Sequence, residues 1–328
     1  MKRTSRLVQP IASAALAALV ACTNAPGPKT ETKTDAWLNV LSVNVGNLDE
    51  VVDKTCGVAP YQGGLCSVAQ EEVIASNLAA LRPDVAFLTE LVDSGRCEPD
   101  SWEGDTDLIC TGAPDRNPKE QVRRLVGDDY TISCASTHAT CVAVLSERVT
   151  LHGCAPGELC LDGNDTAPHP DACGTMGSRT SVSRIDATVD DVSFALIPVH
   201  ALNALNEAED PCRLAQFNLA LEDVSTGADA LIAGDWNMDP YRAPDAFPSG
   251  LYWHTQVGPE ARFTAHNVPN DGTTPTPTWA TAATLDFVLS DFLQGECDVL
   301  GETEGTTRID GEELATMDHR AVWCALSR

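Results

Sequence analysis

Short apolar runs recur along the chain from residue 37 onward, and polar stretches separate them. Residues 37–45 (WLNVLSVNV) place apolar side chains at the two-residue period of a strand. Residues 84–88 (DVAFL) form a short apolar run that is typical of a buried strand. The same reasoning predicts strands at 141–145, 181–189, 192–200, 230–234, 284–290 and 321–326.

Two segments place apolar residues at helical spacing instead. The first starts at Ser67, which forms a capping-box pattern with Gln70, and Pro83 ends it. The apolar face of this helix holds Ile74, Leu78 and Leu81. The second starts at Asp210 and Pro211, because proline is favoured in the first turn of a helix. Its apolar side holds Leu214, Phe217 and Leu221.

Strands outnumber helices in this pattern, and polar residues follow several of the strand ends. Such an alternation predicts an α/β sandwich that forms one domain over residues 37–328. The segment from about 91 to 175 is rich in Cys, Gly and Asp and contains one clear strand, at 141–145. We interpret this segment as Cys-rich insertions, pinned by disulfides, on the core of the domain.

The beginning of the chain has the layout of a secretory signal. Three basic residues precede an apolar run from about residue 11 to residue 21, which is too short to cross a bilayer. The run ends in LVAC, which resembles the bacterial lipobox and implies a signal peptide over residues 1–21 with lipidation of Cys22. Residues 22–36 then form a flexible tether. We expect an exported protein, lipid-anchored to a bacterial membrane and facing the periplasm or the cell exterior.

The cysteine count supports an exported protein. The chain has 13 Cys, and setting aside Cys22 leaves an even number, which indicates disulfides in an oxidising compartment. No CxxC pair is present that would support a zinc site. The connectivity stays open; sequence proximity suggests the pairs Cys56/Cys66, Cys134/Cys141, Cys154/Cys160 and Cys297/Cys324.

Charge narrows the choice of function. The formal net charge is −27, and the predicted mature chain is more acidic still because residues 1–21 contain basic but no acidic residues. Such a field repels polyanions and argues against a broad basic surface that grips DNA. It leaves open a nuclease that reaches a phosphate through a bound metal ion.

Polar residues at the ends of the predicted strands are the candidates for chemistry. Each of them alone has a structural explanation, as a turn former, a cap or a surface charge. Asp235 and Asn237 lie two apart, so in an extended chain their side chains would share one face. The full set, in chain order, is Asn44, Glu90, His200, Asp235, Asn237, Asp286, Asp318 and His319.

The segments that carry these residues resemble the motifs of the endonuclease/exonuclease/phosphatase superfamily. They are, in family order, LSVNVGN, DVAFLTEL, IPVHALN, GDWNMDP, PTWATAATLDFVLS and MDHRAVW. The superfamily includes pancreatic-type deoxyribonucleases, apurinic-site endonucleases, bacterial sphingomyelinases and inositol-phosphate phosphatases. The resemblance covers nearly all of residues 37–328 and is weakest at 91–175. It implies a four-layer, deoxyribonuclease-like fold, in which helices flank a two-sheet β-sandwich.

The resemblance also implies a metal site and a phosphate site. Glu90 is the expected metal ligand, with Asn44 and Asp318 close by, and oxygen donors without Cys favour Mg²⁺ or Mn²⁺. Arg179 resembles a phosphate-contacting arginine, although an ion pair at the rim of the core is an equal interpretation. His200 would donate a hydrogen bond to a phosphate oxygen.

The remaining candidates would carry the proton chemistry. Asp235 and Asn237 would align the attacking water with the phosphate. His319 would contact the phosphate and act as acid or base, with Asp286 orienting its ring.

These expectations describe a divalent-metal-dependent phosphodiesterase that acts as an extracytoplasmic nuclease. One alternative keeps the chemistry but changes the substrate to a phospholipid, as in sphingomyelinases, or to a small phosphoester. A second alternative is a non-catalytic, acidic surface-binding protein. The sequence implies no protein partner.

Overall fold

The computed structural model describes most of the chain from residue 36 onward and builds it around two β-sheets of seven strands each. The described residues are 36–46, 64–92, 120–175, 180–203, 207–242, 247–269, 273–279, 283–300, 307–309, 312–314 and 319–328.

The first sheet is mixed and contains both early and late parts of the chain. Its strands are β1 (Leu38–Asn44), β2 (Val85–Thr89), β3 (Tyr130–Cys134), β4 (Cys141–Leu145), β6 (Leu159–Cys160), β13 (Gln294–Leu300) and β16 (Ala321–Ser327). Their order across the sheet is β13-β16-β1-β2-β4-β3-β6. β1 runs parallel to β2 and antiparallel to β16. The last long strand of the chain therefore lies in the middle of this sheet.

The second sheet is built mainly from the middle of the chain. Its strands are β5 (Thr150–Leu151), β7 (Asp165–Thr166), β8 (Ser181–Val189), β9 (Val192–His200), β10 (Ala230–Asp235), β11 (Thr264–Ala265) and β12 (Asp286–Ser290). Their order is β11-β12-β10-β9-β8-β5, and β7 pairs with β8 beside this path. A small separate hairpin contains β14 (Thr307–Ile309) and β15 (Glu312–Leu314).

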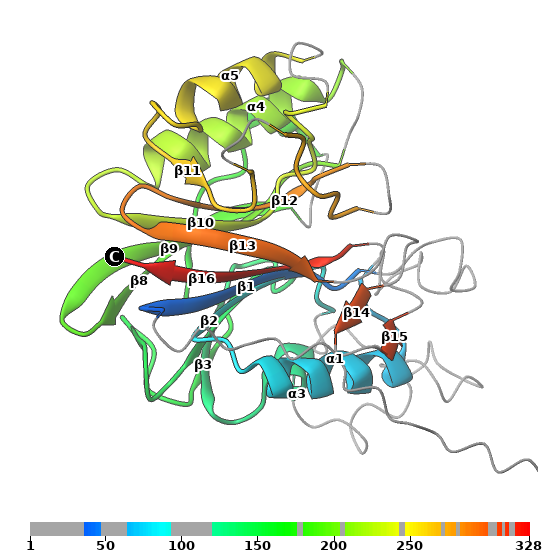
Figure 1. Cartoon of the computed structure of the whole chain (residues 1–328), viewed down its shortest axis with the longest axis vertical. Coiled ribbons are helices and arrows are strands. Elements are labelled where there is room, and N and C mark those ends of the chain that lie inside the picture. Colours follow the sequence, from blue (N-terminus) through cyan, green and yellow to red (C-terminus); the bar gives the residue numbers. More distant parts are fainter. Residues whose placement is uncertain are drawn as a thin grey trace, which may run out of the picture.

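Helices cover the outer face of each sheet, which gives four layers (Figure 1). Figure 1 shows α1 (Val68–Leu81) and α3 (Gln121–Val126) beneath the first sheet, and α4 (Asp210–Asn218) and α5 (Pro248–Gln256) above the second. A 3₁₀ turn at Asp171–Cys173 and a π-helical turn at Leu219–Asp223 complete the helical segments. This arrangement confirms the predicted two-sheet α/β sandwich. None of the helices in the described part of the chain is long and apolar enough to cross a membrane.

The layers explain why the central strands are apolar on both faces. In β1, Leu38 and Val40 pack into the core between the two sheets, whereas Leu41 and Val43 pack toward α1. The strand lies where the two-residue period predicted it, and both of its faces are buried. A strand covered by a sheet on one side and a helix on the other buries both sets of side chains.

Three expectations about local structure need correction. Ser67 is the N-cap of α1, but its side chain makes no capping hydrogen bond, and Gln70 is buried. Leu214 of α4 is only half-buried, and the polar residues Arg213 and Gln216 lie on the buried side of the helix. Within the Cys-rich segment, β3 was not predicted, yet it pairs with β4 as a strand of the first sheet.

Four disulfides lie within the described residues. Three of them, Cys134–Cys141, Cys154–Cys160 and Cys297–Cys324, are pairs that sequence proximity suggested. Cys66 is also disulfide-bonded, and its suggested partner Cys56 lies outside the described residues. The bond Cys173–Cys212 was not predicted; its cysteines are 39 residues apart, and it ties the segment before β8 to α4.

A buried ion pair within α4 contacts α5 through Ser249 above the second sheet. Arg213 on α4 is fully buried, and its Nη2 atom lies 2.8 Å from Oδ1 of Asp210. The backbone N–H of Ser249 on α5 donates to Oδ2 of Asp210 at 3.2 Å, and the Ser249 hydroxyl also donates to this carboxylate. The guanidinium stacks over Phe247. These contacts hold α4 against α5 and satisfy both buried charges.

Candidate active site

Four polar residues form a row across the second sheet at one end of the sandwich. The strand registers align Ser181 of β8 with His200 of β9, His200 with Asp235 of β10, and Asp235 with Asp286 of β12. Leu196 lies in the core between the two sheets, and His200 is four positions further along β9, so its side chain projects to the same face. The residues paired with His200 across the sheet share this face, so all four project toward the first sheet. The strand ends therefore bring together three predicted residues and add Ser181, which the sequence analysis missed.

Asp235 and Asn237 meet through a turn, not through an extended chain. Asn237 has a φ of 51°, so the strand ends at Asp235 and the chain turns there. The backbone N–H of Asn237 donates to Oδ1 of Asp235 at 2.8 Å, and its side-chain amide donates to Oδ2 at 3.0 Å. The two side chains do act on one place, but the reason based on strand period is wrong. The correct reason is the Asx turn.

Asn44 links the two sheets at this site. It is the last residue of β1 in the first sheet, and its Nδ2 atom donates to Oδ2 of Asp235 in the second sheet at 3.0 Å. Its own Oδ1 accepts the backbone N–H of Gly46 at 2.9 Å. A Cβ atom at Gly46 would lie 1.8 Å from Oε2 of Glu90, so glycine is needed there to leave room for that carboxylate.

Glu90 follows β2 in a left-handed backbone conformation, with a φ of 59°. Its Oε1 atom lies 3.5 Å from Nε2 of His200, and its side chain is 25% exposed. Burial acts to raise the pKa of this carboxyl, but the hydrogen bond and charge of His200, with help from His319 and Asn44, lower the pKa to about 2. Glu90 therefore offers a carboxylate that is ionised and open on one side.

The Asp235 carboxyl lies at the centre of the cluster. Its Oδ2 atom is 3.8 Å from Nε2 of His319 and 4.0 Å from Nε2 of His200. Burial raises the pKa of Asp235 to about 7; the charge of His319 opposes this rise, while the neighbouring carboxyl of Asp286 adds to it. A carboxyl that titrates near neutral pH can exchange a proton with a reacting group.

His319 and Asp286 form a buried dyad. The Nδ1 atom of His319 lies 2.7 Å from Oδ2 of Asp286. Because a carboxylate accepts here, Nδ1 carries the proton, and Nε2 faces Asp235. Thr278 supports the dyad from behind: its hydroxyl accepts the backbone N–H groups of Leu285 and Asp286 at 2.9 and 3.0 Å, and its carbonyl accepts the N–H of Arg320. Sequence reasoning missed Thr278, since its part depends on backbone contacts.

The structure thus brings together Asn44, Glu90, His200, Asp235, Asn237, Asp286 and His319. Three predicted residues, Cys22, Arg179 and Asp318, lie outside the described residues.

The cluster has the donor set of a site for a hard cation. One ligand atom each from Glu90, His200 and Asp235 lies within 4.8 Å of the others, and a second such group contains Asp235, Asp286 and His319. Three carboxyl groups in one largely buried cluster repel one another, which a bound cation would offset. Oxygen donors fit Mg²⁺ or Mn²⁺. Glu90 fits best, since Oδ2 of Asp235 already accepts two amide hydrogen bonds.

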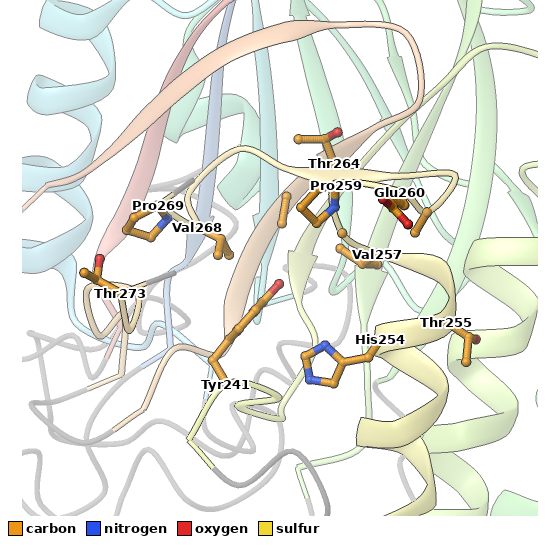
Figure 2. Close-up of a pocket in the computed structure, with 13 residues that line it drawn as sticks. Tyr241, His254, Thr255, Val257, Pro259, Glu260, Thr264, Val268, Pro269 and Thr273 are labelled. Atoms are coloured by element: carbon orange, nitrogen blue, oxygen red, sulfur yellow. The ribbon is translucent and has the colours of Figure 1, made fainter. Parts of the chain in front are cut away.

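A separate cavity of about 740 Å³ lies on the other side of the second sheet. Figure 2 shows Tyr241 and His254 facing the segment that contains Val257 and Pro259 across this cavity. Its lining includes none of the residues of the cluster. The cavity has titratable side chains of its own, Tyr241, His254 and Glu260, but it is separate from the cluster.

Comparison with known proteins supports the fold. No protein-family model and no curated protein sequence matches the chain. Solved structures do match, among them D. rerio TDP2 complexed with single strand DNA product, at 15% identity and a TM-score of 0.55, covering 89% of this chain and 99% of that one. The human Nocturnin catalytic domain with bound sulfate matches at 14% identity and a TM-score of 0.52, covering 88% and 94% of the two chains.

A third match is an endonuclease/exonuclease/phosphatase family protein from Leptotrichia buccalis C-1013-b, at 12% identity and a TM-score of 0.54, covering 89% of this chain and 100% of that one. The chain therefore has the endonuclease/exonuclease/phosphatase fold, as its motifs predicted. Similarity at this level of identity establishes the fold, and the function is argued from the cluster.

Proposed function

We propose that this chain is a divalent-metal-dependent phosphodiesterase that acts as an extracytoplasmic nuclease. The observation that carries the proposal is the meeting of both sheets in one cluster, where Asn44 bonds to Asp235 and Glu90 lies beside His200. The D. rerio TDP2 structure, which shares the fold, holds a single strand DNA product, and this supports nucleic acid as the substrate class.

Glu90 and Asn44 would hold the cation, and Asp318 is proposed as a further ligand. When bound, the cation polarises a phosphoryl oxygen and offsets the negative charge that develops during attack. Gly46 keeps the space that the Glu90 carboxylate needs. These residues explain how so acidic a chain could bind an anionic ester, since attraction would come from the ion and not from the surface.

The other residues would position water and move protons. Asp235 accepts hydrogen bonds from Asn44 and Asn237, which fix its carboxyl so that it can orient and deprotonate the attacking water. His319, oriented by Asp286, would contact the phosphate through Nε2 and serve as acid or base. His200, at the end of β9, would donate to a phosphate oxygen.

Disulfides in the domain support export to an oxidising compartment. We therefore propose that the chain functions outside the cytoplasm, anchored by a lipid at Cys22. Fractionation of cells that express the full chain should recover it with membranes, and Cys22→Ser should release it in soluble form. Recovery of the wild-type chain in the cytosol would contradict this proposal.

Metal addition is expected to both activate and stabilise the oxidised protein. Mg²⁺ or Mn²⁺ should permit nicking of a supercoiled plasmid, and chelator should abolish it. A cation at 100 times its dissociation constant adds about 2.7 kcal/mol to the free energy of unfolding, which thermal unfolding detects as a higher Tm. Glu90→Gln should lose both effects, because it removes the open carboxylate.

Glu260→Gln is the matched control, since Glu260 is an exposed glutamate that lines the separate cavity of Figure 2, away from the cluster. It should keep both responses. Metal-independent nicking, or an equal rise of Tm in Glu90→Gln, would contradict the proposed metal site. A folded, metal-binding protein that cleaves no nucleic acid would refute the nuclease and redirect the assay to phospholipids and small phosphoesters.

A further inference from the structure

Ser181 extends the row of the candidate active site by one strand. It is the first residue of β8 and lies directly across from His200 of β9. Paired residues of antiparallel strands project their side chains to the same face, about 4.5–5.5 Å apart. Ser181 therefore projects to the face that carries His200, Asp235 and Asp286.

A pocket of about 410 Å³ begins at Ser181, where β8 enters the second sheet. This volume lies within the range of roughly 300–1,000 Å³ that is usual for small-molecule sites. Five hydroxyl side chains line it: Ser136, Thr137, Thr166, Thr180 and Ser181. They come from the turn between β3 and β4, from β7 and from the start of β8.

The walls of this hydroxyl-lined pocket are held in place by hydrogen bonds. Gln216 of α4 donates to the Thr180 hydroxyl at 2.9 Å and accepts the backbone N–H of Leu202 at 2.8 Å. Leu202 follows His200, so the same glutamine braces the pocket and the candidate active site. On the opposite wall, the backbone N–H of Ser136 donates to the Thr166 hydroxyl at 3.1 Å.

Ser181 belongs both to the row of the candidate active site and to the lining of the pocket. Ser181 is 6% exposed, and within the described part of the chain its hydroxyl oxygen has no hydrogen-bond partner. A buried hydroxyl without a partner costs free energy, and a ligand that bonds to it recovers that cost.

The lining restricts the chemistry of a ligand. Among the described residues it contains no carboxylate, ammonium or guanidinium group, although the chain as a whole is strongly acidic. It contains no Phe, Tyr or Trp, and its one aromatic side chain is the imidazole of His169, which is exposed at the pocket rim. Val182, Leu219 and Ala167 add small apolar surfaces between the hydroxyls. Hydroxyls that donate and accept, interrupted by apolar patches, match the hydroxyls and C–H faces of a sugar ring.

We propose that this pocket binds an uncharged, polyhydroxylated ring of the phosphoester substrate, with the Ser181 hydroxyl bonding to the part of the ring nearest the phosphate. The proposal rests on the proposed phosphodiesterase function for its link to catalysis. It assigns substrate selection to the start of β8 and to the segment around Ala167, outside the residues of the catalytic cluster.

The test compares diesters that release the same p-nitrophenolate but differ in the second alcohol. One carries methyl riboside through its 5-oxygen, one carries methyl glucoside through its 6-oxygen, and one carries only methanol. Ala167→Leu fills the pocket, and Ser181→Ala removes one hydroxyl without adding bulk. For the preferred sugar diester, kcat/KM should fall about tenfold in Ala167→Leu and roughly three- to tenfold in Ser181→Ala, as expected for one lost hydrogen bond. The methyl diester should be hydrolysed at the wild-type rate.

Ala261→Leu is the matched control, because Ala261 lines the separate cavity of Figure 2. It should leave all three diesters unaffected. The riboside and glucoside arms distinguish a five-membered from a six-membered ring. Equal losses for sugar and methyl diesters in both pocket variants, or no loss for either, would overturn the pocket.

Binding of the free methyl glycosides, measured by saturation-transfer NMR, separates the pocket from the catalytic proposal. A signal that is present in the wild type, lost in Ala167→Leu and kept in Ala261→Leu supports the pocket even if no diester is hydrolysed, a result that would refute the phosphodiesterase. Hydrolysis of all diesters without sugar preference or glycoside binding would refute the pocket and leave the phosphodiesterase standing.

Discussion

His319→Ala is expected to lower the rate of phosphodiester cleavage by about 10²–10⁴-fold, the usual contribution of a positioned acid or base. The reason is that the Asp286 carboxylate fixes the ring of His319 through its 2.7 Å contact with Nδ1, which leaves Nε2 to face Asp235 and the site. Cleavage of a plasmid or an aryl phosphodiester at saturating Mg²⁺ measures the effect. Circular dichroism should show an unchanged fold.

His152→Ala serves as the matched control, because His152 is exposed and hydrogen-bonds to Thr188 at the far end of β8. It should retain wild-type activity. Asp286→Asn should also lower the rate, and the double variant should be little slower than His319→Ala, because residues that act as a unit are not additive. A His319→Ala enzyme within threefold of wild type would exclude His319 from the chemistry.

Arg213→Met is expected to lower the free energy of unfolding by about 3–5 kcal/mol, the cost of leaving a buried charge without its partner. Asp210 would remain buried at 2% exposure with only the Ser249 contacts to stabilise it. Urea unfolding of the oxidised protein measures the change. Since α4 and α5 cover the second sheet, cleavage activity should be lost at a lower urea concentration than in the wild type.

Arg82→Met provides the control for this prediction. Arg82 pairs with Glu147 at 3.0 Å, but its side chain is 49% exposed, and exposed pairs contribute about 0–1 kcal/mol. Replacing both members of the buried pair, as Asp210→Leu with Arg213→Met, should recover part of the loss. A cost below about 1 kcal/mol for Arg213→Met alone would show that the pair does not stabilise the two helices.

The sequence predicts that several candidate residues lie together because of where they stand along the strands. His200, Asp235 and Asp286 each stand at an end of an apolar run, and the register of neighbouring strands then forces them into one row. A strand end is visible in a sequence as a change from apolar to polar residues. The contact of Asn44 with Asp235 joins two different sheets, and the sequence analysis did not predict it.

Other features depend on contacts that leave no local pattern. Ser181 gains its position from its register with His200, and Thr278 acts through backbone N–H groups seven and eight residues later. The Cys173–Cys212 bond spans 39 residues. The Ser67 capping box also failed: the Ser67 side chain makes no cap, and Gln70 is buried. Sequence patterns capture what is periodic or adjacent, and tertiary packing decides the rest.

The place of β16 in the first sheet has a consequence for biosynthesis. Leu38 of β1 pairs with Leu326 of β16, and β13 is attached to β1 only through β16. While a ribosome is still making the chain, β1 has no partner on that side, and the site lacks His319. The sandwich can therefore close only after synthesis has reached its last strand, since such long-range pairing waits for the whole chain.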